Sequence, residues 1–291
     1  MEIKLSDYEW LIKTDVIDQL LMTNDFEIVE LDSGMEATVY RIQSYKVNVE
    51  LVLKLWNKRV PADVMKQYYL LVKLGEAGLS VSKAYALGRN IYGEYGLITS
   101  YDGLPMPFGS IEIGNMQAIA NHLVRIHSTD ITQLIDDIPK YDDFLGYFFS
   151  LNGDHADIAN LLQNILQDVT LKTNCMIHGD FNLGNVLINN DNYTVIDWTN
   201  AQLGDNRYDL AWAIFLILIY NGEDCYRQFY DAYTQKIAID PKEIYIFEMI
   251  ACLRWIWLSR IAPIPIHRDT LSRVKGFIEN HKEIEKVAFA G

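Results

Sequence analysis

Residues 178–197 read HGDFNLGNVLINNDNYTVID. In this stretch two apolar runs, VLI and YTVI, flank the turn-forming residues NNDN, a pattern that predicts a β-hairpin. A hairpin folds its two ends together, so Asp180 and Asn185 at one end should lie near Asp197 at the other. Mg²⁺ prefers a few carboxylate or amide oxygens, with phosphate and water completing its octahedron. The stretch therefore predicts a Mg-nucleotide site in which one carboxylate remains to face a hydroxyl group.

A surface hairpin with solvated side chains would account for any one of these acids alone. It accounts less well for the whole arrangement, because each acid stands where the catalytic scheme of a kinase needs one. The set His178-Gly179-Asp180, Asn185 and Ile196-Asp197-Trp198 resembles the motifs of the aminoglycoside phosphotransferase and choline kinase family of kinase-like enzymes. Residues 204–211 match a further motif of that family, and a weaker resemblance extends over nearly the whole chain.

The resemblance implies an α+β, bilobal protein-kinase-like fold. A five-stranded antiparallel sheet would form an N-terminal nucleotide-binding lobe over residues 1–101. A mainly helical lobe over residues 102–291 would carry the catalytic and substrate-binding groups. The implied cofactors are ATP and Mg²⁺.

The resemblance also assigns roles to the residues of the opening stretch. Asp180 would be the catalytic residue that orients and deprotonates the acceptor hydroxyl group. Asn185 and Asp197 would be the metal ligands, and Asp209 would brace the catalytic loop from inside the helical lobe. Phosphoryl transfer depends on such positioning and charge neutralisation more than on covalent chemistry.

A nucleotide flap is predicted near the N-terminus, where a strand at 26–31 is followed by a short loop and by strands at 38–43 and 47–56. Ser33 and Gly34 in this loop would cover the phosphates with backbone N–H groups, although an ordinary hairpin turn explains a single glycine equally well. Lys54 on the third strand would place its charge on the phosphates. A solvated edge position is the alternative for this lysine.

The helix that begins near Pro61 carries Gln67 on the same face as Val64, Leu71 and Leu74. Members of the family usually place a glutamate on this helix to pair with the strand lysine. No glutamate lies between Glu50 and Glu76, and the corresponding place falls at or near Gln67. This departure puts the strength of ATP binding in doubt more than the fold, because a glutamine can hydrogen-bond an ammonium group without pairing its charge.

The adenine site is also implied by the resemblance. The Thr99 carbonyl and the Tyr101 N–H would bind the edge of the base, in a hinge that follows strands at 82–89 and 91–101. Its faces would be sandwiched by four apolar side chains, those of Val39, Val52, Leu187 and Ile196. Plain core packing is the alternative for these four residues, since most side chains of this type are buried for stability alone.

Helices are predicted over the first twenty-odd residues and over 115–127, 141–151, 156–169, 207–220, 225–237, 241–261 and 270–287. His127 and His178 are expected to be packed or hydrogen-bonded structural residues, since they lack the paired spacing of a zinc site. The aromatic residues that crowd the 241–261 helix favour core packing, and an aromatic wall for an ammonium ligand is the alternative; they are Tyr245, Phe247, Trp255 and Trp257.

Charge and composition limit the partners. The net charge of −14 argues against nucleic acid. Residues 1–101 hold 14 acids and 11 bases, net −3, whereas residues 102–291 hold 25 acids and 14 bases, net −11, which favours a cationic acceptor. The longest apolar run, 210–220, is too short to span a bilayer. Three scattered cysteines and the lack of a signal-peptide pattern predict a cytoplasmic protein with no membrane partner.

These observations predict an ATP-dependent phosphotransferase that moves the γ-phosphoryl group to a hydroxyl group of a small cationic molecule. Aminoglycoside-like acceptors come first and choline-like acceptors next, while homoserine, macrolides and other acceptors remain open. The alternative is a nucleotide-binding protein of kinase-like fold with little or no transfer activity, suggested by Gln67 and the single glycine of the flap.

Overall fold

The computed structural model describes residues 3–33, 37–56, 64–106, 114–133, 138–140, 143–149, 155–167 and 169–286. The chain forms two compact units. The first comprises residues 1–104 together with 187–196, and the second comprises 105–186 together with 197–291. This division places residues 102–104 and the hairpin residues 187–196 in the first unit, whereas the predicted boundary follows residue 101.

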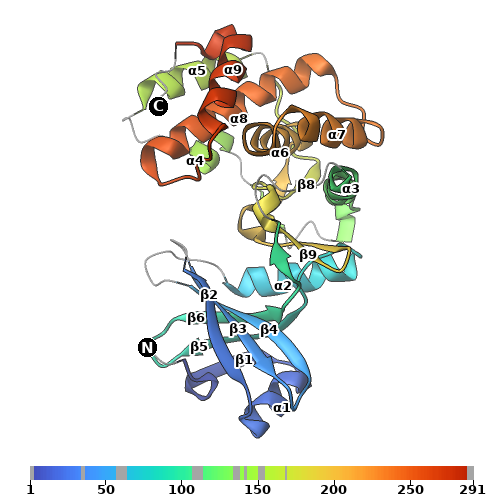
Figure 1. The fold of residues 1–291 in the computed structure, drawn as a ribbon, viewed down its shortest axis with the longest axis vertical. Coiled ribbons are helices and arrows are strands. Elements are labelled where there is room, and N and C mark those ends of the chain that lie inside the picture. The colour runs from blue at the N-terminus through green and yellow to red at the C-terminus, as the bar shows by residue number, and fades with distance from the viewer. Residues whose placement is uncertain are drawn as a thin grey trace. The chain divides into compact units, whose positions relative to one another are not determined.

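An antiparallel sheet of six strands forms the first unit, in the order β1-β5-β6-β4-β3-β2 (Figure 1). Two helices, α1 (Asp15–Thr23) and α2 (Val64–Glu76), accompany it, and a short 3₁₀ turn at Leu5–Asp7 precedes it. The strands are β1 (Tyr8–Lys13), β2 (Glu27–Ser33), β3 (Ala37–Ser44), β4 (Val49–Trp56), β5 (Ala84–Asn90) and β6 (Tyr95–Ser100).

The sixth strand corrects the prediction of five. Residues 8–13 were expected to be helical because Ser6 and Glu9 have the spacing of a capping box. Instead β1 pairs with β5, and its burial alternates with a period of two, Tyr8, Trp10 and Ile12 being covered more than their neighbours. That alternation is the pattern of a strand with one face on the core. The helix predicted over the first twenty-odd residues is confirmed in its second half as α1, which buries Ile17 and Leu20.

The two faces of the sheet carry different sets of side chains. One face buries Ile42, Leu51 and Leu53 against Ile17 and Leu20 of α1. Burial of a side chain of this size contributes about 1.5–3 kcal/mol, so this core fixes the register of the strands. Because successive side chains of a strand alternate, the residues between these core positions on β3 and β4 point to the opposite face. That second face is where the nucleotide-binding residues were predicted.

The second unit is mainly helical. Helix α6 (Asn206–Asn221) is apolar on nearly all sides and packs against α7 (Glu223–Thr234), α8 (Pro241–Ile261) and α9 (Thr270–Asn280). The other helices are α3 (Asn115–His127), α4 (Phe144–Phe149) and α5 (Ala156–Leu166), and strands β8 (Cys175–Ile177) and β11 (Gln202–Gly204) pair antiparallel. No helix in the described part of the chain is long and apolar enough to cross a membrane.

The predicted hairpin is confirmed as β9 (Val186–Asn189) and β10 (Asn192–Val195), with β7 (Leu104–Pro105) beside β9. Asn190 and Asp191 at its turn both have positive φ, 47° and 67°, as the tight turns of hairpins require. The Val195 N–H donates to the Ser80 carbonyl at 2.9 Å, which ties the hairpin to the first unit. At Gly103 (φ 113°) a Cβ atom would lie 2.1 Å from the Ile188 carbonyl oxygen, so only glycine allows this close approach.

Candidate active site

The loop that carries Asp180 is held from beneath by a buried carboxylate. It follows β8, and Asp209 on α6 accepts hydrogen bonds from the backbone N–H groups of His178 at 2.7 Å and Gly179 at 2.9 Å. Gly179 has a φ of 78°, and a Cβ atom there would lie 2.5 Å from the Asn200 carbonyl oxygen. The predicted bracing role of Asp209 is therefore confirmed, and it requires the glycine of the His178-Gly179-Asp180 motif.

His127 extends this brace. Its Nε2 lies 3.0 Å from Asp209 Oδ2 and its Nδ1 lies 2.6 Å from the Tyr233 hydroxyl group. With the proton on Nε2, the imidazole donates to Asp209 and accepts from Tyr233, which satisfies three buried polar groups at once. Burial alone would raise the pKa of Asp209, but the bonds from His127 and from the His178 backbone hold that pKa below its ordinary value. The expectation that His127 is structural is confirmed.

His178, the other histidine expected to be structural, is fully buried. Its ring packs at 4.8 Å from the ring of Trp198, and its Nδ1 accepts a hydrogen bond from the Asp180 N–H at 3.3 Å. These contacts confirm the packed, hydrogen-bonded role and fix the start of the Asp180 loop.

Asp180 itself has one oxygen oriented by an indole. Trp212 Nε1 donates to Asp180 Oδ1 at 2.8 Å, while the amide nitrogens of Asn182 and Asn185 lie 3.5 and 3.4 Å from Oδ2. Among the described residues Oδ2 has only these long contacts, so it is the oxygen better placed to receive a proton. Removal from water raises the pKa of Asp180, and the nearby Arg254 guanidinium and the Trp212 bond offset this only in part. A raised pKa makes a carboxylate a stronger proton acceptor.

Arg254 on α8 supports the same loop from inside the helical unit. Its Nη1 donates to the Gly179 carbonyl at 2.9 Å and to the Tyr208 hydroxyl group at 2.5 Å. Its guanidinium lies 4.2 Å from the centre of the Trp212 ring, in cation–π contact. Arg254 and Trp212 had no assigned role from sequence, because they come from two helices that meet the loop only in the folded chain.

The predicted metal ligands lie on either side of the hairpin. Asn185 Nδ2 donates to the Asp180 carbonyl at 3.0 Å, which directs the amide toward the Asp180 loop. Asp197 has a φ of 61°, and its Oδ1 accepts from the Thr199 hydroxyl group at 2.7 Å. One carboxylate and one amide oxygen suit Mg²⁺, which keeps waters and phosphate oxygens as its other ligands. Among the described residues no group of three or more His, Cys, Asp or Glu could hold a metal, so a site made of protein ligands alone is not formed there.

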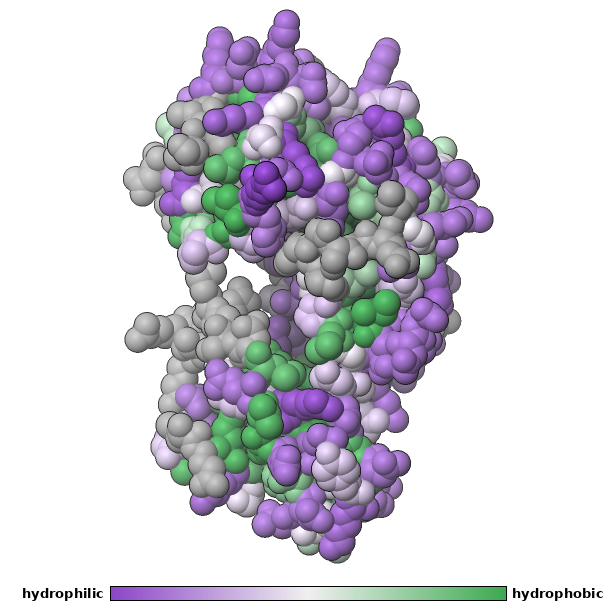
Figure 2. Space-filling view, viewed as in Figure 1, coloured by the Kyte–Doolittle hydropathy of each residue, from purple (hydrophilic) through white to green (hydrophobic). Residues whose placement is uncertain are grey.

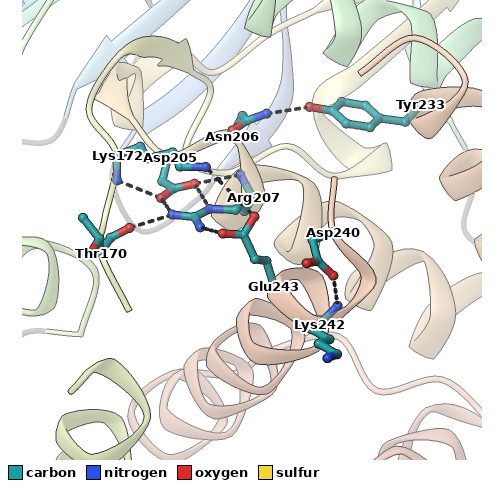
Figure 3. Close-up of polar contacts among 9 residues, drawn as sticks. All are labelled: Thr170, Lys172, Asp205, Asn206, Arg207, Tyr233, Asp240, Lys242 and Glu243. Atoms are coloured by element: carbon teal, nitrogen blue, oxygen red, sulfur yellow. Dashed lines mark hydrogen bonds and ion pairs between the residues drawn. The ribbon is translucent and has the colours of Figure 1, made fainter. Parts of the chain in front are cut away.

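An ion network fixes the start of α6 (Figure 3). Asp205 caps the helix by accepting from the Arg207 N–H at 3.0 Å. The Arg207 guanidinium bonds both carboxylate oxygens of Asp205, at 2.9 and 2.6 Å, and Glu243 of α8 at 2.5 Å. Arg207 and Asp205 are both buried, so their pair is shielded from solvent, whereas Glu243 is partly exposed. These pairs set the position from which α6 presents Asp209 and Trp212 to the Asp180 loop.

A cavity of about 240 Å³ opens beside Asp180 within the second unit. Its lining is largely apolar and aromatic, and Asp180 is the one charged side chain among the described residues that form it. Trp255 of the predicted aromatic stripe takes part, whereas Phe247 is buried in the core. The lining residues are Asp180, Asn182, Leu183, Trp212, Leu216, Ile217, Tyr220, Asn221, Trp255, Leu258, Ile264 and Pro265.

In the first unit, four of the predicted nucleotide-binding residues share one face of the sheet. Val39 is the cross-strand partner of Lys54, and Val52 is that of Thr99. Partners in a pair point to the same side, and the alternation along β4 places positions 52 and 54 on the face opposite the core. The Lys54 ammonium also lies 5.2 Å from the Trp56 ring centre. The structure therefore brings Val39, Val52, Lys54 and Thr99 together.

For the remaining predicted residues, the structure gives a position but not the predicted contact with the nucleotide or with Lys54. Gln67 is half-buried on α2, which packs against β5 and β6; its contact with Lys54 stays a prediction. Ser33 ends β2, and Gly34 lies outside the described residues. The Tyr101 N–H donates to the Glu50 carbonyl at 3.2 Å, so it must give up that bond to contact adenine. Half-buried Leu187 and Ile196 belong to the first unit.

Comparison with known proteins gives a family. The sequence model of the phosphotransferase enzyme family matches residues 27–247. No curated protein sequence matches. Solved structures do match over nearly the whole chain, at identities that show the fold alone.

A thermostable mutant of aminoglycoside phosphotransferase APH(4)-Ia, in ternary complex with ADP and hygromycin B, matches with a TM-score of 0.66 at 15% identity, covering 94% of this chain and 99% of that one. Amicoumacin kinase hAmiN, in complex with AMP-PNP, Ca²⁺ and Ami, gives 0.65 at 12% identity and covers 94% of each chain. An ethanolamine kinase of Plasmodium vivax gives 0.61 at 13% identity, covering 88% and 81%. The kinase-like fold predicted from the sequence is thereby confirmed.

Proposed function

The chain belongs to the phosphotransferase enzyme family, and from this premise we propose that it transfers the γ-phosphoryl group of ATP to a hydroxyl group of a small molecule. The observation that carries the proposal is the carboxylate of Asp180, oriented by Trp212 at one oxygen and lining an apolar cavity. A base in such a place can bind a hydroxyl group of a molecule in the cavity and take up its proton.

In the proposed reaction Asp180 Oδ2 accepts the proton of the acceptor hydroxyl group. Trp212 holds Oδ1 and so fixes the direction in which Oδ2 points. Asn185 and Asp197 would hold Mg²⁺, as their oxygen donors permit. When bound, Mg-ATP supplies the phosphoryl group and much of the charge neutralisation. Asp209 and Arg254 keep the loop in place through its backbone.

The first unit would bind the nucleotide. Lys54 would place its charge on the phosphates, with Gln67 beside it, and the backbone at Ser33 and Gly34 would cover them. The apolar side chains of Val39, Val52, Leu187 and Ile196 would cover the faces of adenine. Its edge would be read by the Thr99 carbonyl, and by the Tyr101 N–H once that group leaves Glu50.

The acceptor is proposed to be cationic because the helical part of the sequence is strongly acidic, net −11 over residues 102–291 from 25 acids and 14 bases. Hydrophilic side chains, acidic and basic alike, cover much of the surface seen in Figure 2. The acidic excess of the sequence, by long-range attraction, raises the rate at which cations arrive. An aminoglycoside carries several ammonium groups, whereas the described cavity lining has a single carboxylate. A choline-like acceptor with one ammonium group, held against Trp212, Tyr220 and Trp255, fits this lining better.

The test is Mg-dependent release of ADP by the purified protein with a panel of hydroxylated amines. Asp180→Asn should cut kcat by ~10²–10⁴-fold and leave ATP affinity near wild type. Its melting temperature should not fall, because burial disfavours the charged carboxylate. Asp130→Asn, at an exposed surface position, serves as the control.

Full kcat in the Asp180→Asn variant would remove Asp180 from the mechanism. Binding of Mg-ATP without release of ADP above that of the variant, for every acceptor in the panel, would favour the alternative of a nucleotide-binding protein without transfer activity.

A further inference from the structure

The 3₁₀ turn Trp198–Asn200 follows directly on Asp197 and contacts the loop that carries Asp180. The indole of its first residue lies 4.8 Å from the His178 ring. The carbonyl oxygen of its last residue lies 2.5 Å from the place that a Cβ atom on Gly179 would take. The turn is thus packed at both ends, and its middle residue, Thr199, is held beside Asp197.

The Thr199 hydroxyl group donates a hydrogen bond to Asp197 Oδ1 at 2.7 Å. A hydrogen bond to an ionised acceptor is shorter and about twice as strong as one between neutral groups. Because threonine is branched at Cβ, its χ1 angle is restricted and its hydroxyl group keeps one direction. The bond therefore restricts rotation of the Asp197 carboxylate about Cβ–Cγ and sets the direction of both carboxylate oxygens.

The same spacing of aspartate and threonine recurs at Asp130 and Thr132, with a different result. There Thr132 donates to Asp130 Oδ1 through its hydroxyl group at 2.8 Å and also through its backbone N–H at 3.0 Å, so the carboxylate is turned onto the 3₁₀ turn Ile131–Gln133. Asp197, with a φ of 61°, caps none of the N–H groups of its own described turn. Within this turn the Asp197 carboxylate is therefore oriented by the Thr199 hydroxyl group and not by a backbone cap.

The orientation of a carboxylate matters more to Mg²⁺ than to Ca²⁺. Mg²⁺ demands a nearly ideal octahedron with oxygens at about 2.0–2.1 Å, whereas Ca²⁺ accepts more oxygens in a flexible geometry at about 2.3–2.6 Å. Groups that hydrogen-bond a metal ligand from behind are worth roughly tenfold to a hundredfold in metal affinity. Loss of such a group should thus weaken the binding of Mg²⁺ more than that of Ca²⁺.

We propose, on the basis of the proposed phosphotransferase function, that Thr199 is a positioning residue that orients the Asp197 carboxylate for Mg²⁺ and raises the preference of the site for Mg²⁺ over Ca²⁺. In this assignment Thr199 touches neither the metal nor the nucleotide, and it acts only through Asp197. Because the turn that carries it also packs against Gly179, the orientation of the metal ligand is set by the same segment that supports the Asp180 loop.

Calorimetric titration with AMP-PNP, in Mg²⁺, in Ca²⁺ and in EDTA, tests this assignment. Thr199→Val keeps the branched shape of the side chain and removes its hydroxyl group. The gain in AMP-PNP affinity that Mg²⁺ gives over EDTA should fall roughly tenfold in this variant, and the gain from Ca²⁺ should fall by less than about twofold. The affinity in EDTA should stay at the wild-type value. Thr199→Ser, which keeps the hydroxyl group, should restore most of the Mg²⁺ gain.

Thr132→Val is the matched control, since it removes the hydroxyl group of the other pair and should leave all three affinities unchanged. The assignment is overturned if Thr199→Val keeps the wild-type Mg²⁺ gain, if it loses the Mg²⁺ and Ca²⁺ gains alike, or if the serine variant behaves like the valine variant. A fall of the affinity in EDTA would also overturn it, because that result indicates a role in the fold alone. So would a wild-type protein that gains nothing from Mg²⁺.

Release of ADP with hydroxylated amines, measured separately, tests the transfer reaction. A selective loss of the Mg²⁺ gain in Thr199→Val, without ADP release by wild type for any acceptor, would leave the Thr199 assignment standing and reject the proposed function. Release of ADP by wild type, together with an unaltered Mg²⁺ gain in Thr199→Val, would do the reverse.

Discussion

The indole nitrogen of Trp212 donates a hydrogen bond to Asp180 Oδ1 at 2.8 Å, across thirty-two positions of sequence. A carboxylate with one oxygen held in this way presents the other in a fixed direction. The same bond favours the charged form of Asp180, which burial disfavours. Trp212 therefore affects both the geometry and the basicity of the proposed catalytic base.

Trp212→Phe should keep the ring and remove the hydrogen bond. We expect kcat/KM to fall roughly tenfold, because a hydrogen bond to a charged group is worth about 1.5–3 kcal/mol and part of it is recovered from water. The pKa of Asp180 should rise further, so the acidic limb of the pH–rate profile should move to higher pH. Trp255→Phe is the control, since its Nε1 donates to the Tyr220 hydroxyl group instead; an equal shift of the limb there would contradict the role of Trp212.

Asp209→Asn should destabilise the helical unit, because the buried acceptor of three hydrogen bonds loses its charge. The expected loss is about 2–4 kcal/mol at neutral pH, measured by urea unfolding. The folded pKa of Asp209 is depressed, so its contribution is present above the ordinary Asp pKa, near 3.9, and disappears as pH falls through the folded value. The difference between wild type and variant should thus be constant above about pH 5 and shrink in acid.

The control for Asp209 is Asp130→Asn. Asp130 also has a lowered pKa, from the Thr132 backbone and hydroxyl group, but it lies at the surface. Its variant should unfold close to the wild-type midpoint. A stability difference for Asp209→Asn that does not change between pH 7 and pH 3 would contradict the charged brace.

Asp197→Ala should abolish the Mg-dependent part of ATP binding, measured by calorimetry with and without Mg²⁺. Because Asp197 has a φ of 61°, which asparagine tolerates better than alanine, Asp197→Asn is the cleaner second variant. Asp191→Asn, which alters an exposed turn residue of the same hairpin with a similar φ, is the matched control. Unchanged Mg-ATP affinity in both Asp197 variants would place the metal elsewhere.

Gln67→Glu should keep or tighten ATP affinity, by up to roughly fivefold, since a charge-assisted bond to Lys54 is about twice as strong as a neutral one. Gln67→Leu is the comparison, because it removes the amide and should weaken ATP binding. Much weaker binding by the glutamate variant would mean that the uncharged side chain is tuned to this site. A nucleotide-bound structure with another carboxylate beside Lys54 would refute the alignment of Gln67.

Local signals in the sequence were sufficient for the elements with clear ends. Helix α8 begins and ends as predicted, since Asp240 caps it by accepting from the Lys242 N–H and Pro241 occupies its first turn. The hairpin was predictable because its turn residues tolerate positive φ. Strand β1 was not, because the spacing of Ser6 and Glu9 imitates a helix cap and only pairing with β5 reveals the strand.

The residues of the site also differ in whether the sequence alone could predict them. Asp180, Asn185 and Asp197 stand out by their spacing in one short stretch. Trp212 and Arg254 do not, because α6 and α8 bury most of their residues and no periodicity marks the ones that contact the Asp180 loop. Their roles depend on contacts between segments distant in sequence, which a single sequence does not show.

The distribution of tasks along α6 has a consequence for how the protein can evolve. The first two turns carry Asp209, which binds the backbone of the Asp180 loop, and Trp212, which binds the Asp180 carboxylate, so under the proposed mechanism substitutions there should lower turnover for every substrate. Further along, Leu216, Ile217, Tyr220 and Asn221 line the cavity. Under the proposed function, point mutations among these residues should change the preferred acceptor while Asp209 and Trp212 keep their contacts, so single substitutions on one helix give a route to new substrates.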